Sequence, residues 1–286
     1  MTPPPSPAAT TATFVLCSKN GGARLKTCLA RIEALAGPDD LQVVLVDNGS
    51  TDDSFAVMTA WAAKSRFRAE AHQTFVPGNS AGRNVALEHA TGDVIVFIDD
   101  DCYVEPAMVN DWLEVFAQAD IGYGSGRILP FDESNSMVGC NVSTKTELIP
   151  AGRFLRRGLI QGSNMAFRRR CLQDSGWFDP RFGAGTRYAG EEWDVALRAS
   201  FAGWSGGYFP RPTVAHDHGR SDVDARERLL FYDLGAGAVY AKSLFRKGAW
   251  TVARNGYYEA RALGYDPERR RTLLKGCVDF LMARYR

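Results

Sequence analysis

The 286-residue sequence contains no apolar run close to the roughly 20 residues that a membrane-spanning helix requires. The opening MTPPPSPAATTAT has neither the basic start nor the apolar core of a secretory signal. Its 34 basic and 33 acidic residues nearly cancel, so no excess of positive charge favours nucleic acid. The six cysteines lack the paired spacing of a zinc site or a disulfide scaffold. These absences predict a cytoplasmic protein with reduced thiols and no nucleic-acid partner.

The remaining composition is that of a globular protein, with 45% hydrophobic and 23% charged residues. We expect a disordered leader rich in Pro, Thr and Ala over residues 1–12 and a folded domain over 13–220. Its first half would span 13–120 and its second half 121–220. The texture becomes helical after Arg220, which predicts a C-terminal helical extension over 221–286.

Buried strands and amphipathic helices alternate through the first third of the chain. Continuous apolar runs that suit strands covered on both faces occupy 14–17, 41–46 and 94–98. Helical spacing of apolar residues follows over 25–35, and Pro106 opens another helix. This order predicts an α/β fold with a mostly parallel sheet, completed by a mixed region, and ligands beyond the carboxyl ends of the strands.

Three carboxylates, Asp99, Asp100 and Asp101, follow the strand over 94–98. Adjacent like charges are costly unless a cation neutralises them, and oxygen ligands suit Mg²⁺ or Mn²⁺. Asp99 and Asp101 would project to one side of an extended chain and Asp100 to the other. The alternative is an acidic cluster that favours the start of the helix near Pro106.

Blocks in a fixed order resemble the inverting family 2 glycosyltransferases, which have the GT-A fold. The resemblance covers roughly residues 13–218. Its blocks are FVLCSKN (14–20), DNGSTD (47–52), GNSAGRN (78–84), GDVIVFIDDD (92–101), GSNMAFR (162–168), GWFD (176–179) and EEWDVALR (191–198). The resemblance implies a single GT-A domain that binds a nucleotide sugar and a divalent cation.

The resemblance also implies roles for individual residues. Residues expected to contact the nucleotide sugar are Cys17, Ser18, Asn20, Asp47, Asn48, Arg83, Asp99 and Asp100. Asp101 is the expected direct metal ligand, and Asp99 would order the metal site. Asp47 could accept the imide proton of uracil or thymine, and Arg83 could supply positive charge. Turn capping by Asp47 and a solvated helix face for Arg83 remain alternatives.

Glu192 is the expected general base, because a one-step inverting displacement needs one carboxylate to accept the proton of the acceptor hydroxyl. The family has Asp at the matching position, so Glu191 stays as the second candidate. An acidic pair that stabilises a helix start is the alternative explanation. Asp194 and Arg198, four residues apart, are expected to form an intrahelical ion pair.

Two further groups complete the expected site. His216 and His218 alternate on a strand, and one of them, with His216 favoured, would be a metal ligand. Trp193, Trp177 and Tyr188 lie close in sequence to the expected base and would line the acceptor pocket, although such aromatic residues are often core. Trp193 is the first choice because it adjoins Glu192.

The sequence thus predicts a metal-dependent inverting glycosyltransferase for cell-surface glycan or glycolipid assembly. The donor would be a nucleoside-diphosphate sugar (UDP first, dTDP or GDP as alternatives), and the acceptor a glycan or a lipid-linked molecule. A nucleotidyltransferase and a non-catalytic nucleotide-sugar-binding module remain alternatives. A phosphohydrolase with an aspartyl nucleophile is disfavoured, because the first strand ends in Cys17-Ser18 rather than Asp.

The last predicted helix combines a basic face with an apolar stripe. Its basic residues are Arg269, Arg270, Arg271, Lys275, Arg284 and Arg286, and its stripe is Leu273, Leu274, Cys277, Val278 and Leu281. Such a helix can lie on an anionic membrane surface, which predicts a peripheral position at its inner face. Packing of this helix on the catalytic domain is the alternative. A homodimer also stays open.

Overall fold

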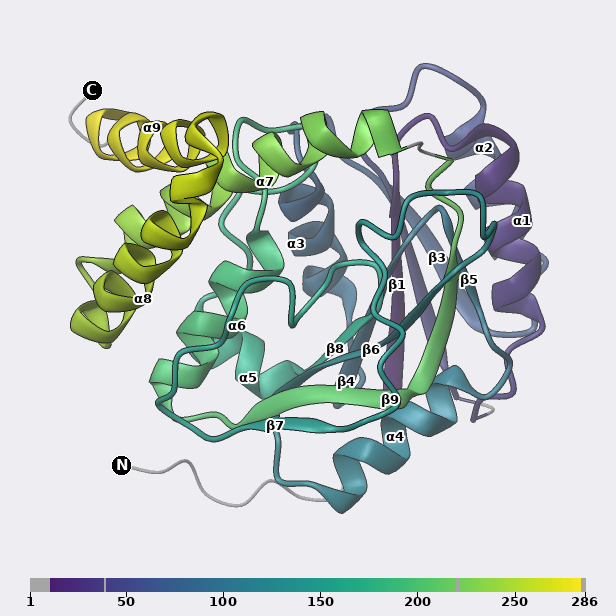
Figure 1. Cartoon of the computed structure of the whole chain (residues 1–286). Helices are drawn as coiled ribbons and strands as arrows, with labels where there is room; N and C mark the ends of the chain where they lie inside the picture. Colours follow the sequence, from purple (N-terminus) through teal and green to yellow (C-terminus); the bar gives the residue numbers. More distant parts are fainter. Residues whose placement is uncertain (1–10, 39, 220–221, 284–286) are drawn as a thin grey trace.

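The computed structural model describes residues 11–38, 40–219 and 222–283, which form an α/β fold with helices on both sides of one sheet (Figure 1). The strands are β1 (Ala12–Ser18), β2 (Gln42–Asp47), β3 (Arg68–Gln73), β4 (Val94–Asp99), β5 (Cys102–Val104), β6 (Tyr123–Pro130), β7 (Glu147–Ile149), β8 (Met165–Arg168) and β9 (Gly206–His216). The helices are α1 (Gly22–Glu33), α2 (Ser54–Ala62), α3 (Asn79–His89), α4 (Met108–Gln118), α5 (Arg169–Ser175), α6 (Glu191–Ala202), α7 (Asp222–Ser243), α8 (Ala249–Ala262) and α9 (Pro267–Ala283), with a 3₁₀ turn η1 (Leu263–Tyr265) before α9.

The sheet has the strand order β3-β2-β1-β4-β8-β6-β9-β5, and β7 pairs with β9 outside this path. Strands β3, β2, β1 and β4 are mutually parallel, so their carboxyl ends meet at one edge. Strand β8 is antiparallel to both neighbours, whereas β6 and β9 are parallel to each other. The predicted mixed α/β sheet is confirmed.

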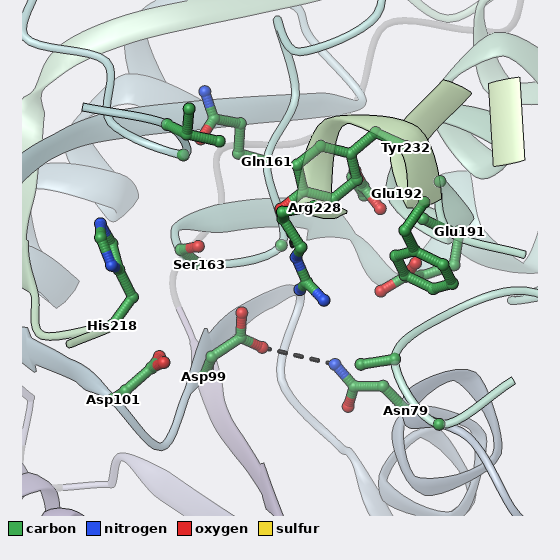
Figure 2. A pocket seen from close by; sticks show the side chains of 18 of the residues that line it. Asn79, Asp99, Asp101, Gln161, Ser163, Glu191, Glu192, His218, Arg228 and Tyr232 are labelled. Atoms are coloured by element: carbon green, nitrogen blue, oxygen red, sulfur yellow. Dashed lines mark hydrogen bonds between the residues drawn. The ribbon is translucent and has the colours of Figure 1, made fainter. Parts of the chain in front are cut away.

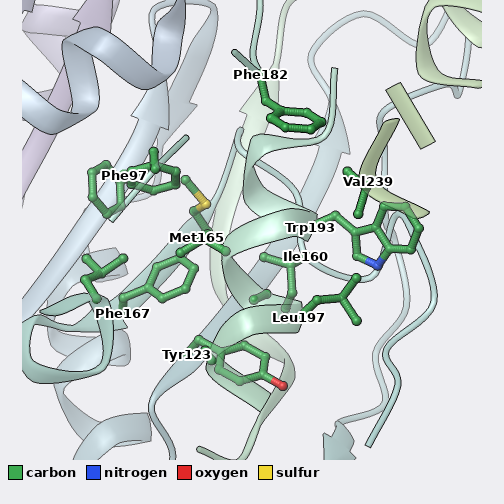
Figure 3. Close-up of a cluster of buried hydrophobic side chains, with 14 of the residues drawn as sticks. Phe97, Tyr123, Ile160, Met165, Phe167, Phe182, Trp193, Leu197 and Val239 are labelled. Atoms are coloured by element: carbon green, nitrogen blue, oxygen red, sulfur yellow. The ribbon is translucent and has the colours of Figure 1, made fainter. Parts of the chain in front are cut away.

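Two hydrophobic clusters cover the two faces of the sheet, because side chains alternate along each strand. In β1, Phe14 and Leu16 join the cluster with α1, α2 and α4, and Val15 joins the cluster with α3, α5 and α6. Figure 3 shows part of the second cluster, in which Phe97, Met165 and Phe167 of the sheet lie beside side chains of α6. Packing in this cluster therefore fixes the position of α6 relative to the strands of the sheet.

Three of the observed strands were predicted from the sequence. The apolar strands expected over 14–17, 41–46 and 94–98 correspond to β1, β2 and β4. Strand β3 and helix α8 were not expected. The predicted leader 1–12 lies largely outside the described residues, and β1 begins at Ala12.

Helices α7 and α9 pack with their backbones in close contact. A Cβ atom on Gly237 of α7 would lie 2.0 Å from the carbonyl oxygen of Leu273 in α9. A Cβ atom on Gly276 of α9 would lie 2.0 Å from the carbonyl oxygen of Leu234 in α7. Only glycine fits at either position without separating the helices.

A buried ionic network joins α7 to α6 and to the loop before it. The Lys242 ammonium of α7 lies 2.7 Å from a carboxylate oxygen of Asp179 and 2.7 Å from one of Asp194. Arg198 pairs with Asp194 at 2.8 Å, which confirms the predicted intrahelical ion pair. Burial would raise the pKa of Asp179, but bonds from Arg181 and Lys242 hold this pKa well below its usual range. The network therefore keeps Asp179 negatively charged in the interior.

Replacing Lys242 with Met is expected to reduce the free energy of unfolding by about 3 kcal/mol, because two buried carboxylates lose a cation while each keeps one arginine. Urea denaturation measures this change. The matched control is Lys275→Met, which removes an exposed ion pair with Asp279 and should cost less than about 1 kcal/mol. Equal losses in the two variants would show that the buried network does not stabilise the fold.

Candidate active site

A cavity of about 720 Å³ opens where β1 and β4 end, between the sheet and the amino-terminal parts of α6 and α7. This is the edge at which ligands bind in open α/β sheets. Figure 2 shows Asp99 and Asp101 on one side of the view and Glu192 and Tyr232 on the other. Residues expected from the sequence that line it are Cys17, Ser18, Asn48, Asp99, Asp100, Asp101, Glu191, Glu192, Trp193, His216 and His218.

Asp101 and His216 lie together at one end of the cavity, next to Cys102. Potential ligand atoms of these three side chains all lie within 4.8 Å of one another. Oδ1 of Asp101 is 3.4 Å from Nε2 of His216. Burial would raise the pKa of Asp101, but the bond and charge of His216 lower it. Burial likewise opposes the shift at His216, yet Asp101 raises the pKa of this imidazole to about 9. The pair thus stabilises a negative charge on Asp101.

These side chains fit a hard divalent cation. Burial and the nearby carboxylates raise the pKa of the Cys102 thiol well above its usual value, and hard cations prefer oxygen ligands to sulfur. A carboxylate oxygen and an imidazole nitrogen remain, and these donors suit Mn²⁺. His218 is less suited to bind the cation, because its Nε2 is engaged with the carbonyl oxygen of Ser136 at 2.8 Å.

Arg83 lies beneath the cavity floor and connects its two acidic sides. Its side chain is 1% exposed, so the alternative of a solvated helix face is wrong. Nη1 donates to Oε1 of Glu191 at 2.9 Å, and Nη2 donates to Oδ1 of Asp99 at 3.1 Å. Asp99 also accepts a hydrogen bond from Asn79. Asp99 and Glu191 are therefore both engaged with one buried cation.

Glu192 is the second residue of α6, next to Glu191, and this half-buried residue lines the cavity. Burial, together with the negative charge of Glu191, raises the pKa of Glu192 well above its usual value. A carboxylate with a raised pKa is a stronger base when deprotonated. Since Arg83 engages Glu191, Glu192 is the member of the pair with the properties of a general base.

The acidic triplet does not continue the strand geometry that the sequence suggested. Strand β4 ends at Asp99, and the chain turns at Asp100 and Asp101. As a result all three residues line the cavity, and Asp100 is not directed away from it. Asp100 accepts a hydrogen bond from Ser18, and burial raises its pKa to about 6.

Asp47 ends β2 and lies behind Asn48, which lines the cavity. Its Oδ2 accepts hydrogen bonds from the backbone of Gly49 and Ser50 and from Gln73 at 2.8 Å. Asp47 therefore caps the turn, as the alternative expected. Its Oδ1 is nevertheless buried and lacks a hydrogen-bond partner among the described residues.

Asn20 does not line the cavity; its side chain accepts a hydrogen bond from the backbone of Thr51.

The three aromatic residues expected at the acceptor pocket lie in different surroundings. Trp193 lines the cavity, yet it is buried, and its indole nitrogen donates to the carbonyl of Leu155 (Figure 3). Trp177 lines a smaller, separate cavity beside α3 and α5. Tyr188 packs against Phe280 in the core. The structure thus places only Trp193 of this group at the main cavity.

The cavity also includes residues that the sequence analysis did not single out. They are Asn79, Ser136, Gly139, Gln161, Gly162, Ser163, Arg228 and Tyr232, among others. Gly162 and Ser163 belong to a block used for the resemblance, so their position could have been anticipated. Arg228 and Tyr232 lie on α7, and no local sequence pattern distinguishes them from other helix residues.

The cavity at the strand ends, with an acidic turn on one side and Glu192 on the other, is compatible with the GT-A fold. The chain belongs to glycosyl transferase family 2, whose model matches residues 13–176. The family assignment that the sequence blocks suggested is thereby confirmed.

Curated relatives match short parts of the chain. Glycosyltransferase GlyG of Streptococcus pneumoniae is 26% identical over 96 residues, which are 34% of this chain and 32% of GlyG. The poly(ribitol-phosphate) β-N-acetylglucosaminyltransferase TarS of Staphylococcus aureus is 31% identical over 72 residues, 25% of this chain and 13% of TarS. The chain therefore aligns with a third or less of the length of these relatives.

Solved structures share the fold over nearly the whole chain. A mannosyltransferase from Pyrobaculum calidifontis, in complex with GDP-Man and Mn²⁺, has a TM-score of 0.65 at 19% identity. That similarity covers 97% of this chain and 88% of the other. The S. aureus TarS structure has a TM-score of 0.64 at 15% identity and covers 90% of this chain and 44% of TarS. These similarities confirm the GT-A fold.

Proposed function

We propose that this protein transfers a sugar from a nucleoside-diphosphate sugar to a hydroxyl acceptor by a metal-dependent, inverting displacement. The observation that carries the proposal is that Glu192 and the Asp101–His216 pair line the same cavity. A leaving group with two phosphates needs positive charge, and an attacking hydroxyl needs a base. The two sides of the cavity supply groups suited to these needs.

Asp101 and His216 would hold the cation, with Asp99 and Arg83 ordering the floor below it. A bound Mn²⁺ or Mg²⁺ would neutralise charge on the departing diphosphate. Glu192 accepts the proton of the acceptor hydroxyl while the new C–O bond forms at the anomeric carbon. The bond from that carbon to the phosphate oxygen breaks, and its electron pair leaves with the nucleoside diphosphate. Attack opposite the leaving group inverts the anomeric configuration.

A uridine diphosphate sugar is the donor class that we propose first. The buried Oδ1 of Asp47 is an acceptor suited to the imide N–H of uracil, and thymine carries the same group. Structures of TarS with UDP and UDP-GlcNAc and of the mannosyltransferase with GDP-Man support a nucleotide-sugar donor. Guanine has no imide group, but its N–H groups can also donate to a carboxylate, so GDP sugars are the alternative donors.

The test is metal-dependent release of nucleoside diphosphate from a panel of UDP, dTDP and GDP sugars with simple glycan acceptors. We expect release with one base class, more with acceptor than without it, and an inverted product by proton NMR. A retained configuration would contradict the one-step displacement. Formation of pyrophosphate from a nucleoside triphosphate and a sugar phosphate would instead support a nucleotidyltransferase, and binding without turnover a non-catalytic module.

We further propose that the enzyme meets a lipid-linked acceptor at an anionic membrane surface, but through α8 rather than the expected α9. Within α9, Arg269 donates to the buried Asp233 and Leu273 is buried, so this helix packs on α7. Its Leu274 and Val278 remain exposed. No helix in the described ranges is long and apolar enough to span a bilayer. Any membrane contact made by these helices would therefore be peripheral.

Helix α8 and the turn before it present aromatic and basic side chains to solvent. The exposed aromatic residues are Phe245, Trp250, Tyr257 and Tyr258, and the exposed basic ones are Arg246, Lys247, Arg254 and Arg261. Trp250 is 80% exposed. Glu259, the only acidic residue in 244–262, faces inward, where it pairs with Arg157 at 2.5 Å. Exposed Trp and Tyr with basic neighbours are typical of membrane-interface helices.

Changing both Arg254 and Arg261 to Ala is expected to weaken binding to anionic vesicles roughly 30-fold, because each basic side chain contributes about 1 kcal/mol. Vesicle co-sedimentation at low and high salt measures the effect. The control changes Arg270 and Arg271 of α9 to Ala. Loss in the control alone would restore α9 as the contact, and concentration-dependent self-association without vesicle binding would indicate a homodimer surface.

A further inference from the structure

A second group of metal-ligating side chains lies away from the main cavity, on the edge strand β3 and the last turn of α3. Glu70 and His72 project from β3, and His89 projects from α3. One potential ligand atom from each of the three lies within 4.8 Å of those from the others. None of the three lines the main cavity, and all are half-buried, so an ion from solvent can reach them.

A buried glutamine holds this group in place. Gln42 of β2 is 3% exposed, and its Nε2 donates both to Oε1 of Glu70 at 2.7 Å and to the carbonyl oxygen of His89 at 3.0 Å. Its Oε1 accepts hydrogen bonds from Thr13 and Thr91, which fixes the orientation of the amide. One rigid amide therefore positions a ligand carboxylate and the residue that carries a ligand imidazole. Such outer partners orient the ligands of metal sites in proteins.

We propose that Glu70, His72 and His89 bind a borderline divalent transition-metal ion, with Zn²⁺ as the reference ion. Two imidazoles and one carboxylate are donors that suit Zn²⁺, and the remaining coordination position is left to water. Nε2 of His72 lies 3.1 Å from Oε2 of Glu70, a separation that one ion can bridge.

The two imidazole rings must rearrange when the ion binds. They stack face to face with centroids 3.7 Å apart and planes inclined by 12°, so their nitrogen lone pairs do not yet converge. The half-exposed His89 ring can turn about its side-chain bonds without moving the helix.

An ion at this site would link two elements that support the active site. Strand β3 ends at Gln73, whose side chain donates to Asp47. Helix α3 carries Asn79 at the cavity and Arg83 beneath its floor. Joining the end of α3 to β3 opposes separation of these elements. An ion that binds the folded state alone raises the melting temperature, by about 4 °C for a chain of this size at 100 times its dissociation constant.

The test is titration of the full-length protein with Zn²⁺ by calorimetry, together with the absorption spectrum of the Co²⁺ form. We expect one Zn²⁺ site, in addition to any at Asp101, that is retained in Asp101→Ala and lost in His89→Ala and in His72→Gln. The Co²⁺ spectrum of this site should show nitrogen and oxygen ligation without a thiolate charge-transfer band. Glu88→Gln, beside His89 and exposed, is the matched control and should bind as the wild type does.

Melting curves without metal establish that each variant folds. Curves with Zn²⁺ should show the rise in the wild type, in Asp101→Ala and in Glu88→Gln, and no rise in His89→Ala or His72→Gln. Unchanged stoichiometry in both histidine variants would overturn the proposal. Binding that requires millimolar Zn²⁺, or an equal Zn²⁺-induced shift in all variants, would also overturn it. Transfer activity is not needed for any of these readings, so failure of the proposed function would not affect them.

Discussion

Glu192→Gln is expected to reduce the turnover number for sugar transfer by about 10²- to 10⁴-fold, because the amide cannot accept the proton of the acceptor hydroxyl. The substitution preserves the shape of the side chain, and Glu192 is separated from Asp101 in Figure 2. Donor affinity should therefore stay within about twofold of wild type, since the interaction removed acts on the reaction rather than on binding. Steady-state rates and donor titration measure the two quantities.

The companion variant is Glu191→Gln, which weakens the ion pair with the buried Arg83. We expect it to lower stability, because Arg83 then keeps Asp99 as its one carboxylate partner, and to retain part of the turnover. If Glu191→Gln abolishes transfer while Glu192→Gln transfers normally, the base is Glu191 and the assignment is off by one residue.

The pH dependence of wild-type turnover provides an independent reading of the same group. Burial and the charge of Glu191 raise the pKa of Glu192 well above its ordinary value. The deprotonated form is active, so turnover should fall as the pH is lowered through this pKa. The acidic limb should thus lie at higher pH than an ordinary glutamate would give, and it should be absent from the residual activity of Glu192→Gln.

Asp101→Ala is the second substitution with a large expected effect, about 10³-fold on turnover at saturating donor. It removes the carboxylate that pairs with His216, and with it most of the proposed cation site. Several kcal/mol of charge stabilisation on the diphosphate would be lost, at 1.36 kcal/mol for each tenfold change. Initial rates across a Mn²⁺ titration measure the effect.

Asp100→Asn is the control for Asp101→Ala, because this neighbour bonds to Ser18 and is not part of the Asp101–Cys102–His216 group. We expect it to change donor affinity more than metal dependence. Full turnover of the wild type in the presence of a chelator would contradict the role of the cation.

The parts of the fold that could be predicted are those with dense apolar patterning. Strands β1, β2 and β4 are buried on both faces, so their sequences are continuous apolar runs. Strand β3 reads Arg-Ala-Glu-Ala-His-Gln and lies at the sheet edge, where one side lacks a neighbour and polar side chains are tolerated. Helix α8 exposes aromatic side chains that disrupt the expected division into an apolar and a polar face.

The candidate site was predictable where its residues follow strands and less so where they depend on packing. Asp101 directly precedes β5, and His216 is the last residue of β9. The two side chains come close because Cys102 pairs with His216 between these antiparallel strands. The burial of Arg83 between Asp99 and Glu191 depends on contacts over more than 100 residues of sequence, which no local pattern encodes. The placement of Trp177 and Tyr188 depends on the same tertiary packing.

The close contact of α7 and α9 at Gly237 and Gly276 also restricts how this chain can diverge in evolution. Any side chain at either position pushes the helices apart, so neither glycine can be exchanged without a compensating change in the other helix. The first half of α7, which carries Arg228 and Tyr232 at the cavity, has no such restriction. Substitutions there would therefore change the lining of the cavity while the second half of the same helix keeps its contact with α9.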